Sequence, residues 1–221
     1  MSELTLYIGN KNYSSWSLRA WLSLKHVGTP FKEVVIPLEG PGILTTEIGK
    51  HSPSGKVPVL RYGEFVVWDT MAIQEYLAEE FHQSHLWPSD RFARATARSV
   101  SAEMHAGFGA LRTAMPMNIR RKPFELRRTE EVEADVARVQ AIWSDCRRRF
   151  GSGGAFLFGR YSIADSMFAP VATRFRTYGV PLDDHATAYV EAIYALPSMK
   201  EWVEGAKKEY MAIEEYDRIG A

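Results

Sequence analysis

Short apolar runs and amphipathic stretches alternate along the first part of the chain. The runs at 4–9 (LTLYIG) and 30–38 (PFKEVVIPL) are typical of strands. Apolar residues at helical spacing predict helices over 15–28 and 69–81. Between these helices, 57–69 holds two apolar runs around a glycine turn, which predicts a β-hairpin.

The order of these elements predicts a mixed sheet followed by a helical domain. A strand–helix–strand unit implies parallel strands, and the hairpin adds an antiparallel pair, so we expect a mixed four-stranded sheet. Pro88 and polar residues break the pattern at 83–90, which we expect to link an α/β domain (1–82) to a domain (91–221) almost without strand signals. Helices are expected near 44–50 in the first domain and at 90–118, 129–150, 162–178 and 186–210 in the second.

Charge and cysteine content limit the partners and the cellular compartment that we expect for this protein. Lys and Arg number 27, as do Asp and Glu, so net charge does not indicate a nucleic-acid partner or an anionic membrane. The single cysteine, Cys146, allows no intrachain disulfide, which fits a reducing compartment. The start, MSELTLY, lacks a signal-peptide pattern, and no uncharged apolar stretch reaches the ~18 residues that span a bilayer. We expect a cytoplasmic protein with no membrane or nucleic-acid partner.

Two adjacent hydroxyls, Ser14 and Ser15, stand where the first strand gives way to the first helix. A serine there commonly caps the helix by accepting a hydrogen bond from a free N–H. The same position suits an anion or a thiolate, because a helix N-terminus carries partial positive charge and unpaired donors. These residues alone leave both interpretations open.

Two further pairs of adjacent residues carry candidate ligand-binding groups. Val57-Pro58 opens a strand, and a trans proline there would be ordinary, whereas a cis bond would turn the Val57 backbone toward a ligand. Asp69-Thr70 begins the next helix and is either a simple cap or a site for a ligand ammonium and carboxylate together. An amino-acid-like group carries both of these charges.

Four segments together resemble the cytosolic glutathione S-transferase family, and within it the bacterial-type, serine-type (zeta-like) subgroup. They are SSWSLRAWLSL (14–24), GKVPVL (55–60), WDTMAIQEYL (68–77) and FGRYSIADSMFAP (158–170). In that order they are similar to the family's serine stretch, its cis-proline loop, its γ-glutamyl-binding step and the capping box of its buried helix. The resemblance implies a thioredoxin-like domain, an all-helical domain that completes the electrophile site, and a homodimer.

The resemblance gives the serine pair a mechanism. Ser14 matches the residue that donates a hydrogen bond to the glutathione sulfur, with Ser15 and Tyr7 as alternatives. Such a donor, with the positive end of the first helix, stabilises the thiolate, which is the reactive form of a thiol. Some relatives place a cysteine at this position, whereas here residues 14–17 are SSWS, so we expect no redox chemistry through a protein cysteine.

The rest of the glutathione site follows from the other two segments. Val57 matches the residue that pairs with the cysteinyl backbone, and Pro58 matches the cis proline. Lys56, in the same loop, is a candidate partner for the glycyl carboxylate. Asp69 and Thr70 match the γ-glutamyl site, where relatives more often carry Glu or Gln followed by Ser.

The helical half supplies the remaining candidates. We expect the electrophile pocket along its first helix, at Met104, His105, Phe108 and Arg112, although the same spacing is typical of a core stripe. Ser162 and Asp165 match a structural capping box.

The predicted function is a transferase that uses glutathione as co-substrate, without a metal, against a small hydrophobic electrophile. One alternative is a glutathione-dependent cis–trans isomerase of a dicarboxylate, of the maleylacetoacetate or maleylpyruvate type. Another is a noncatalytic glutathione-binding or scaffold protein. The sequence does not identify the electrophile or the residues of a dimer interface.

Overall fold

The computed structural model describes residues 3–38 and 46–220. Its first half contains β1 (Leu4–Ile8), α1 (Ser15–Val27), β2 (Lys32–Val35), α2 (Thr46–Gly49), β3 (Val59–Tyr62), β4 (Phe65–Trp68) and α3 (Thr70–Glu80). The strands form one sheet in the order β2-β1-β3-β4. β1 runs parallel to β2 and antiparallel to β3, and β3 runs antiparallel to β4. The predicted mixed four-stranded sheet is therefore confirmed, and the start of the helix expected near 44–50 lies outside the described residues.

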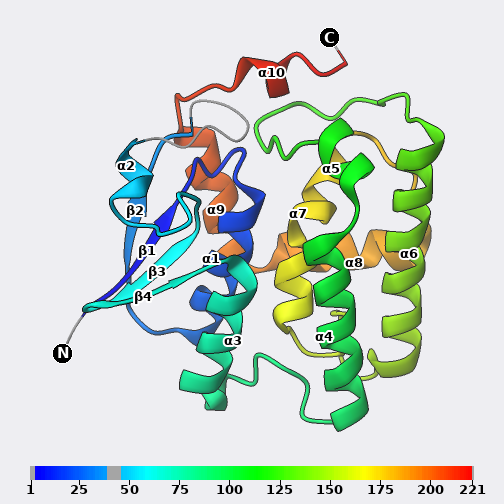
Figure 1. The fold of residues 1–221 in the computed structure, drawn as a ribbon. Coiled ribbons are helices and arrows are strands. Elements are labelled where there is room, and N and C mark those ends of the chain that lie inside the picture. The colour runs from blue at the N-terminus through cyan, green and yellow to red at the C-terminus, as the bar shows by residue number, and fades with distance from the viewer. Residues whose placement is uncertain (1–2, 39–45, 221) are drawn as a thin grey trace.

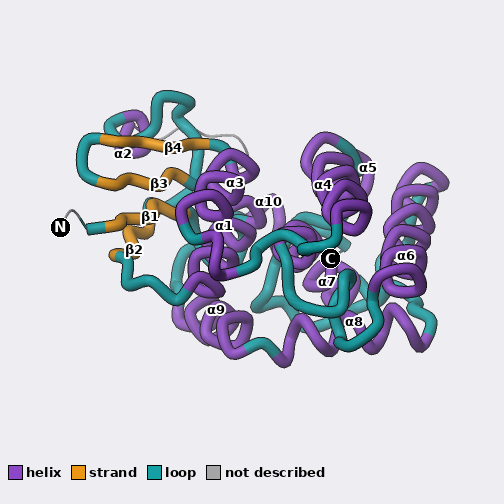
Figure 2. The backbone as a smooth tube through the Cα atoms, turned by 90° about the horizontal axis from the view of Figure 1, so that it is seen from below, coloured by secondary structure: helices purple, strands orange, loops and turns teal. Residues whose placement is uncertain are grey.

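The second half is helical, as predicted. After a short 3-10 turn (His82–Ser84) come α4 (Arg91–Ala106), α5 (Gly109–Ala114), α6 (Glu130–Phe150), α7 (Ile163–Thr177), α8 (Asp184–Ala195), α9 (Pro197–Lys208) and α10 (Glu214–Asp217). Figure 1 shows these helices beside the sheet, and the view from below in Figure 2 places α1 and α3 between the sheet and the helical half. Among the described residues, no helix is long and apolar enough to cross a membrane.

Two of the predicted helices are each divided in two. The helix expected over 90–118 breaks after α4, because Phe108 takes a left-handed backbone conformation with φ 61°. The helix expected over 186–210 breaks at Leu196, which is extended because Pro197 follows it. Pro197 then begins α9, where its missing N–H is tolerated. α10, of four residues, was not predicted.

α7 is the central helix of the molecule. All of its residues except Arg176 are buried. The predicted capping box is present at its start, where the Asp165 carboxylate accepts hydrogen bonds from the backbone N–H and the hydroxyl of Ser162. The Ser23 and Ser166 hydroxyls, 2.8 Å apart, join α1 to α7. One hydrophobic core therefore extends from the sheet through α1 into the helical half.

The chain after α9 returns to the first half. Glu209 accepts hydrogen bonds from the backbone N–H groups of Lys11 and Asn12, at 2.6 and 2.9 Å. The Tyr13 hydroxyl donates to Asp217, which also accepts from the Asn118 side chain. In Figure 1 this C-terminal segment, with α10, runs across the top of both halves. These bonds fix the loop that leads into α1.

Candidate active site

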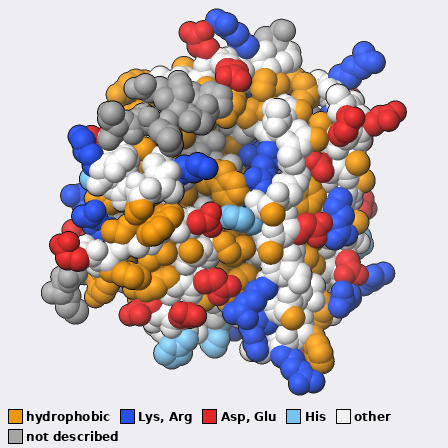
Figure 3. Space-filling model, in the orientation of Figure 1, with side chains coloured by type: hydrophobic (Ala, Val, Ile, Leu, Met, Phe, Trp, Pro, Cys, Tyr) orange, Lys and Arg blue, Asp and Glu red, His pale blue; other side chains and the backbone are white. Residues whose placement is uncertain are grey.

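A cavity of about 570 Å³ lies where the start of α1, the loop before β3, the start of α3 and the end of α4 meet. In Figure 3 this face of the molecule is hollowed between the two halves, with basic side chains in the hollow. Its lining brings together six predicted site residues: Lys56, Val57, Pro58, Asp69, Thr70 and His105. The sequence reasoning missed four others, Trp16, Ser54, Trp68 and Ala106. Trp16, Trp68 and Ala106 each adjoin a residue that was singled out, so chain neighbourhood was the available signal.

Ser14 caps the first helix, as the simpler interpretation predicts. Its Oγ accepts a long hydrogen bond, 3.4 Å, from the Ser17 N–H, and its hydroxyl donates to Ser17 Oγ at 2.7 Å. Ser17 Oγ also accepts from the Gly9 N–H at 3.0 Å. The Ser14 proton is therefore engaged within the protein.

Ser15 is the first residue of α1 and has a different environment. Its Oγ accepts a hydrogen bond from Arg174 Nη2 at 3.2 Å. Among the described residues the Ser15 hydroxyl has no acceptor for its own proton. Both serines are buried, and neither lines the cavity, although Trp16, next in the chain, does.

Tyr7, the third alternative, lies on β1 with its side chain half-buried. Its ring stacks on His51, with centroids 4.2 Å apart. The buried residues of β1 are Leu4, Leu6 and Ile8, so Tyr7 occupies the opposite face of the strand. The Tyr7 ring therefore lies with His51 and not among the buried residues of β1.

Asp69 caps α3 in a strained conformation. Its φ of 70° and ψ of 136° lie in a region that non-glycine residues rarely occupy. One carboxylate oxygen accepts from the Met71 N–H at 2.8 Å, and the other lies 3.4 Å from His105 Nε2. Strain of this kind persists where the surrounding structure imposes it and is common at binding sites.

Thr70 has fewer free hydrogen-bond donors for a ligand than the sequence indicated. Its hydroxyl donates to the Trp16 carbonyl at 3.1 Å, so that proton is not free for a ligand. The bond instead ties the start of α3 to the start of α1. The backbone N–H of Thr70, in the first turn of α3, remains as a donor aimed out of the helix.

The loop before β3 contains the Val57–Pro58 bond, for which the sequence left both cis and trans open. The Val57–Pro58 bond is cis, as the resemblance implies. Val57 and Pro58 both line the cavity. Lys56 is exposed at its edge, and among the described residues its ammonium forms no ion pair.

The four electrophile-pocket candidates separate into two pairs. Met104 and Phe108 are buried in the core, so their spacing reflects packing. His105 lines the cavity, and its ring meets the edge of Trp16 at 5.1 Å between centroids. Arg112 is half-buried and donates to the carbonyls of Met104 and His105.

The remaining chemistry-bearing residues have structural roles. Cys146 is a free, buried cysteine, and burial raises the pKa of its thiol to about 12. Within residues 3–38 and 46–220, no three His, Cys, Asp or Glu side chains form a group that could hold a metal ion.

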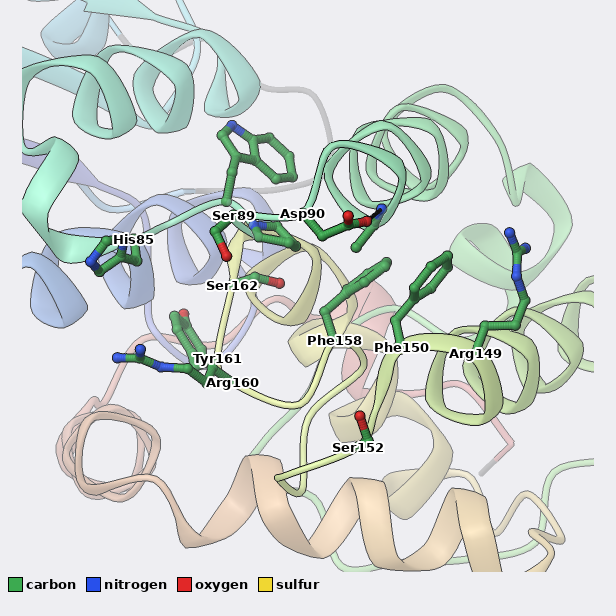
Figure 4. A pocket seen from close by; sticks show the side chains of 13 residues that line it. His85, Ser89, Asp90, Arg149, Phe150, Ser152, Phe158, Arg160, Tyr161 and Ser162 are labelled. Carbon is green, nitrogen blue, oxygen red and sulfur yellow. Dashed lines mark hydrogen bonds between the residues drawn. The ribbon is translucent and has the colours of Figure 1, made fainter.

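A second cavity, of about 370 Å³, lies between the interdomain linker, the end of α6 and the start of α7. Figure 4 shows its side chains, including Phe150 and Phe158, whose rings stack at 5.6 Å. Asp90 and Ser162, which also line it, cap α4 and α7. These two polar groups are thus engaged in holding helix ends.

Comparisons with known proteins agree with this geometry. Residues 13–80 match the profile of the glutathione S-transferase N-terminal domain, and residues 129–206 match that of the C-terminal domain. A solved Burkholderia glutathione transferase homolog with bound glutathione is 25% identical, with a TM-score of 0.70, and the match covers 95% of this chain and 100% of that one.

Curated relatives match over shorter stretches. Glutathione S-transferase 1 of Dianthus caryophyllus is 37% identical over 42% of this chain and 41% of its own length. Maleylacetoacetate isomerase of Pseudomonas aeruginosa is 27% identical over 81% of this chain and 85% of its own. The chain spans about half the length of the first curated relatives, 41% to 48%. Two domain profiles of one family, in order, and a solved relative matched over nearly the whole chain show that this protein belongs to the glutathione S-transferase family.

Proposed function

We propose that this protein binds glutathione in the cavity at the start of α1 and α3 and stabilises its thiol as a thiolate. The thiolate then attacks a small electrophile held between the two halves. The observation that carries the proposal is the convergence of five predicted glutathione-site residues, Lys56, Val57, Pro58, Asp69 and Thr70, on one cavity.

The charges around the cavity suit the two ends of glutathione. The Asp69 carboxylate would pair with the γ-glutamyl ammonium, and the Thr70 N–H, at the positive end of α3, would bind the γ-glutamyl carboxylate. The Lys56 ammonium, which forms no ion pair among the described residues, would bind the glycyl carboxylate. Between these ends, the Val57 backbone would pair with the cysteinyl residue like an added strand.

This placement directs the sulfur toward the start of α1. A free cysteine thiol has a pKa of about 8.5, and each unit by which the site lowers it is about 1.4 kcal/mol of thiolate stabilisation. The resemblance assigns the donated hydrogen bond to Ser14, which would have to release Ser17 to make it. Ser15 is the alternative whose proton has no acceptor among the described residues. Among the described residues, neither serine is hydrogen-bonded to a group that could act as a general base, so each would act as a donor and not as a nucleophile.

A second candidate function is the cis–trans isomerase. It would use the same thiolate, which adds to a double bond and then leaves again. The match to the Pseudomonas aeruginosa maleylacetoacetate isomerase, over 81% of this chain, favours keeping it. A homodimer in the cytoplasm completes the proposal, in line with the resemblance.

The test is the pH dependence of conjugation with 1-chloro-2,4-dinitrobenzene. Wild-type activity should stay high from pH 8 down to about pH 7, because the bound thiol remains ionised below its ordinary pKa. Alanine at the donor serine, Ser14 or Ser15, should move this profile up by about one pH unit, which is about 1.4 kcal/mol. Ser99→Ala, an exposed serine on α4, is the matched control. Tight glutathione binding without turnover of any electrophile would instead favour the noncatalytic alternative.

A further inference from the structure

His105 and Asp69 face each other across the boundary between the two halves of the protein. His105 lies near the end of α4, Asp69 caps the start of α3, and both line the cavity of the proposed glutathione site. His105 Nε2 lies 3.4 Å from Asp69 Oδ2, a distance that suits an ion pair better than an ordinary hydrogen bond. The two side chains are 31% and 49% exposed, so a ligand in the cavity can reach both groups.

The surroundings of the His105 ring fix which of its nitrogens faces Asp69. The ring meets the edge of Trp16, with centroids 5.1 Å apart and an interplanar angle of 72°. The other nitrogen, Nδ1, is buried and has no hydrogen-bond partner among the described residues. A charged imidazolium carries a proton on both nitrogens, so it would bury an N–H group without an acceptor, which is unfavourable.

Asp69 is the carboxylate that favours a charged His105. Within the described part of the chain, no other Asp or Glu lies within 4.0 Å of the His105 ring nitrogens. The charged side chains that face this region from the neighbouring elements are Arg19 on α1, Lys56 before β3, Arg112 on α5, Asp135 on α6 and Arg174 on α7. Most of them are cationic and oppose a further positive charge, so the pairing with Asp69 is what stabilises a proton on His105.

We propose that His105 is a positioning residue of the γ-glutamyl site, and that its protonation decides whether Asp69 is free to bind the ligand ammonium. With His105 neutral, the Asp69 carboxylate is available and takes the ammonium of glutathione. With His105 protonated, the imidazolium pairs with Asp69 and repels the ammonium from the same position. Binding of the ammonium therefore releases one proton from His105 to solvent. This inference rests on the proposed function.

The proton release makes glutathione affinity fall as the pH is lowered. Imidazole side chains ordinarily take up a proton near pH 6.5, whereas the carboxylates and the ammonium of a peptide keep their charges between pH 5.5 and pH 7.0. Over that interval the neutral fraction of such an imidazole falls by about eightfold. Competition for Asp69 should therefore weaken glutathione binding by about fivefold.

Two unreactive ligands that differ only in the ammonium test this role by calorimetry. They are S-methylglutathione and its analogue in which glutaryl replaces γ-glutamyl, so that hydrogen replaces the amino group. For the wild type, the Kd of S-methylglutathione should rise by about fivefold from pH 7.0 to pH 5.5, and that of the analogue by less than about twofold. Because the sulfur is methylated, thiol ionisation has no part in either result.

Substitutions assign the pH dependence to the facing pair. His105→Gln keeps a polar side chain that does not titrate, and Asp69→Asn removes the charge for which the imidazolium competes. Each should hold the pH effect on S-methylglutathione below about twofold. His82→Gln, which changes an exposed histidine of the 3-10 turn, is the matched control and should keep the effect of about fivefold.

A kinetic measurement separates this role from a purely structural one. From pH 7.0 to pH 5.5, the KM for glutathione should rise by about fivefold more in the wild type than in His105→Gln. The kcat at saturating glutathione should follow the same pH profile in both proteins. A histidine that only supported the structure would give the two proteins the same pH dependence of KM.

A pH effect that is absent, that is equal for the two ligands, or that survives in His105→Gln would overturn the proposal, and the first two results need no variant. A wild type that binds neither ligand would refute the glutathione site as well. An ammonium-dependent pH effect in a protein that does not lower the thiol pKa of glutathione would support the role of His105 and refute the transferase. The two failures are therefore distinguishable.

Discussion

Asp69 keeps a backbone conformation that its own side chain makes unfavourable. A glycine would fit φ 70° and ψ 136° without strain, which at other residues contributes about 1–3 kcal/mol against folding. The carboxylate offsets part of this by capping α3 through the Met71 N–H. Its other oxygen faces His105 and the cavity, which is where a ligand ammonium would bind. The residue is best understood as a binding group that also serves as a cap.

Asp69→Asn separates these two roles. Asparagine still caps helices, so the free energy of unfolding should change by less than about 0.5 kcal/mol. The lost charge should weaken glutathione binding by about tenfold, or about 1.4 kcal/mol. Calorimetric titration and chemical denaturation measure the two effects. Asp90→Asn, which changes the equivalent cap of α4 far from this cavity, should leave the glutathione Kd unchanged. A Kd that is also unchanged in Asp69→Asn would refute the assigned contact.

At the level of elements, α7 depends on one buried carboxylate. Asp165 accepts hydrogen bonds from the N–H of Leu157, from the N–H and hydroxyl of Ser162, and from the Tyr189 hydroxyl. Burial raises the pKa of Asp165 to about 6, against the opposing effect of these donors. The capping box thus holds the start of the central helix with a group that titrates below neutrality.

The stability of the protein should therefore depend on pH through Asp165. Because its pKa of about 6 exceeds the ordinary 3.8, the folded state binds this proton more strongly than the unfolded chain. The contribution of Asp165 to the free energy of unfolding should fall as pH rises from about 4 to about 6, by about 3 kcal/mol in all, and stay constant above. Urea denaturation of the wild type relative to Asp165→Asn, which does not titrate, measures it. A difference that is flat, or that rises with pH, would contradict the prediction.

The elements also show where sequence patterns stop being sufficient. The strands and α1, α3, α6 and α7 follow from periodicity and from caps, because those signals are local. The break between α4 and α5 has a local signal in Gly107, which caps the end of α4, whereas the sequence gives no reason for Phe108, a non-glycine residue, to adopt φ 61°. Pro197, in contrast, was a visible local signal for the start of α9.

At the scale of the whole molecule, the site depends on segments that are distant in sequence. The predicted glutathione residues could be found because each lies in a recognisable segment of its own. The neighbourhood of Arg19, Arg112 and Arg174 could not be found in this way, because these arginines come from α1, α5 and α7 and approach one another only when the helices pack together. Spacing alone marked Arg112 and gave no reason to connect it with the other two.

The reactivity of the Cys146 thiol tests how tightly the helices of the second half pack together. Its side chain is 1% exposed in the core, and burial raises the pKa of its thiol to about 12. The native protein should therefore react with a thiol reagent such as 5,5′-dithiobis(2-nitrobenzoate) at pH 8 at least about a hundredfold more slowly than the protein unfolded in guanidinium chloride, since the thiolate is the reactive form. Absorbance at the released thiolate band measures the rate. Rapid labelling of the folded protein would show that α6, which carries Cys146, opens readily. It would also make a redox role for Cys146 a hypothesis again.

The central claim is that the start of α1 stabilises the glutathione thiolate, and an ultraviolet difference titration of bound glutathione tests it most directly. Thiolate absorbance is followed with pH for the wild type, Ser14→Ala and Ser15→Ala. The account predicts a thiol pKa at least about one unit below the free value of about 8.5 in the wild type. It also predicts that alanine at the donor serine removes most of that shift. Glutathione that binds with an unshifted thiol pKa, or a shift that survives both substitutions, would contradict the account.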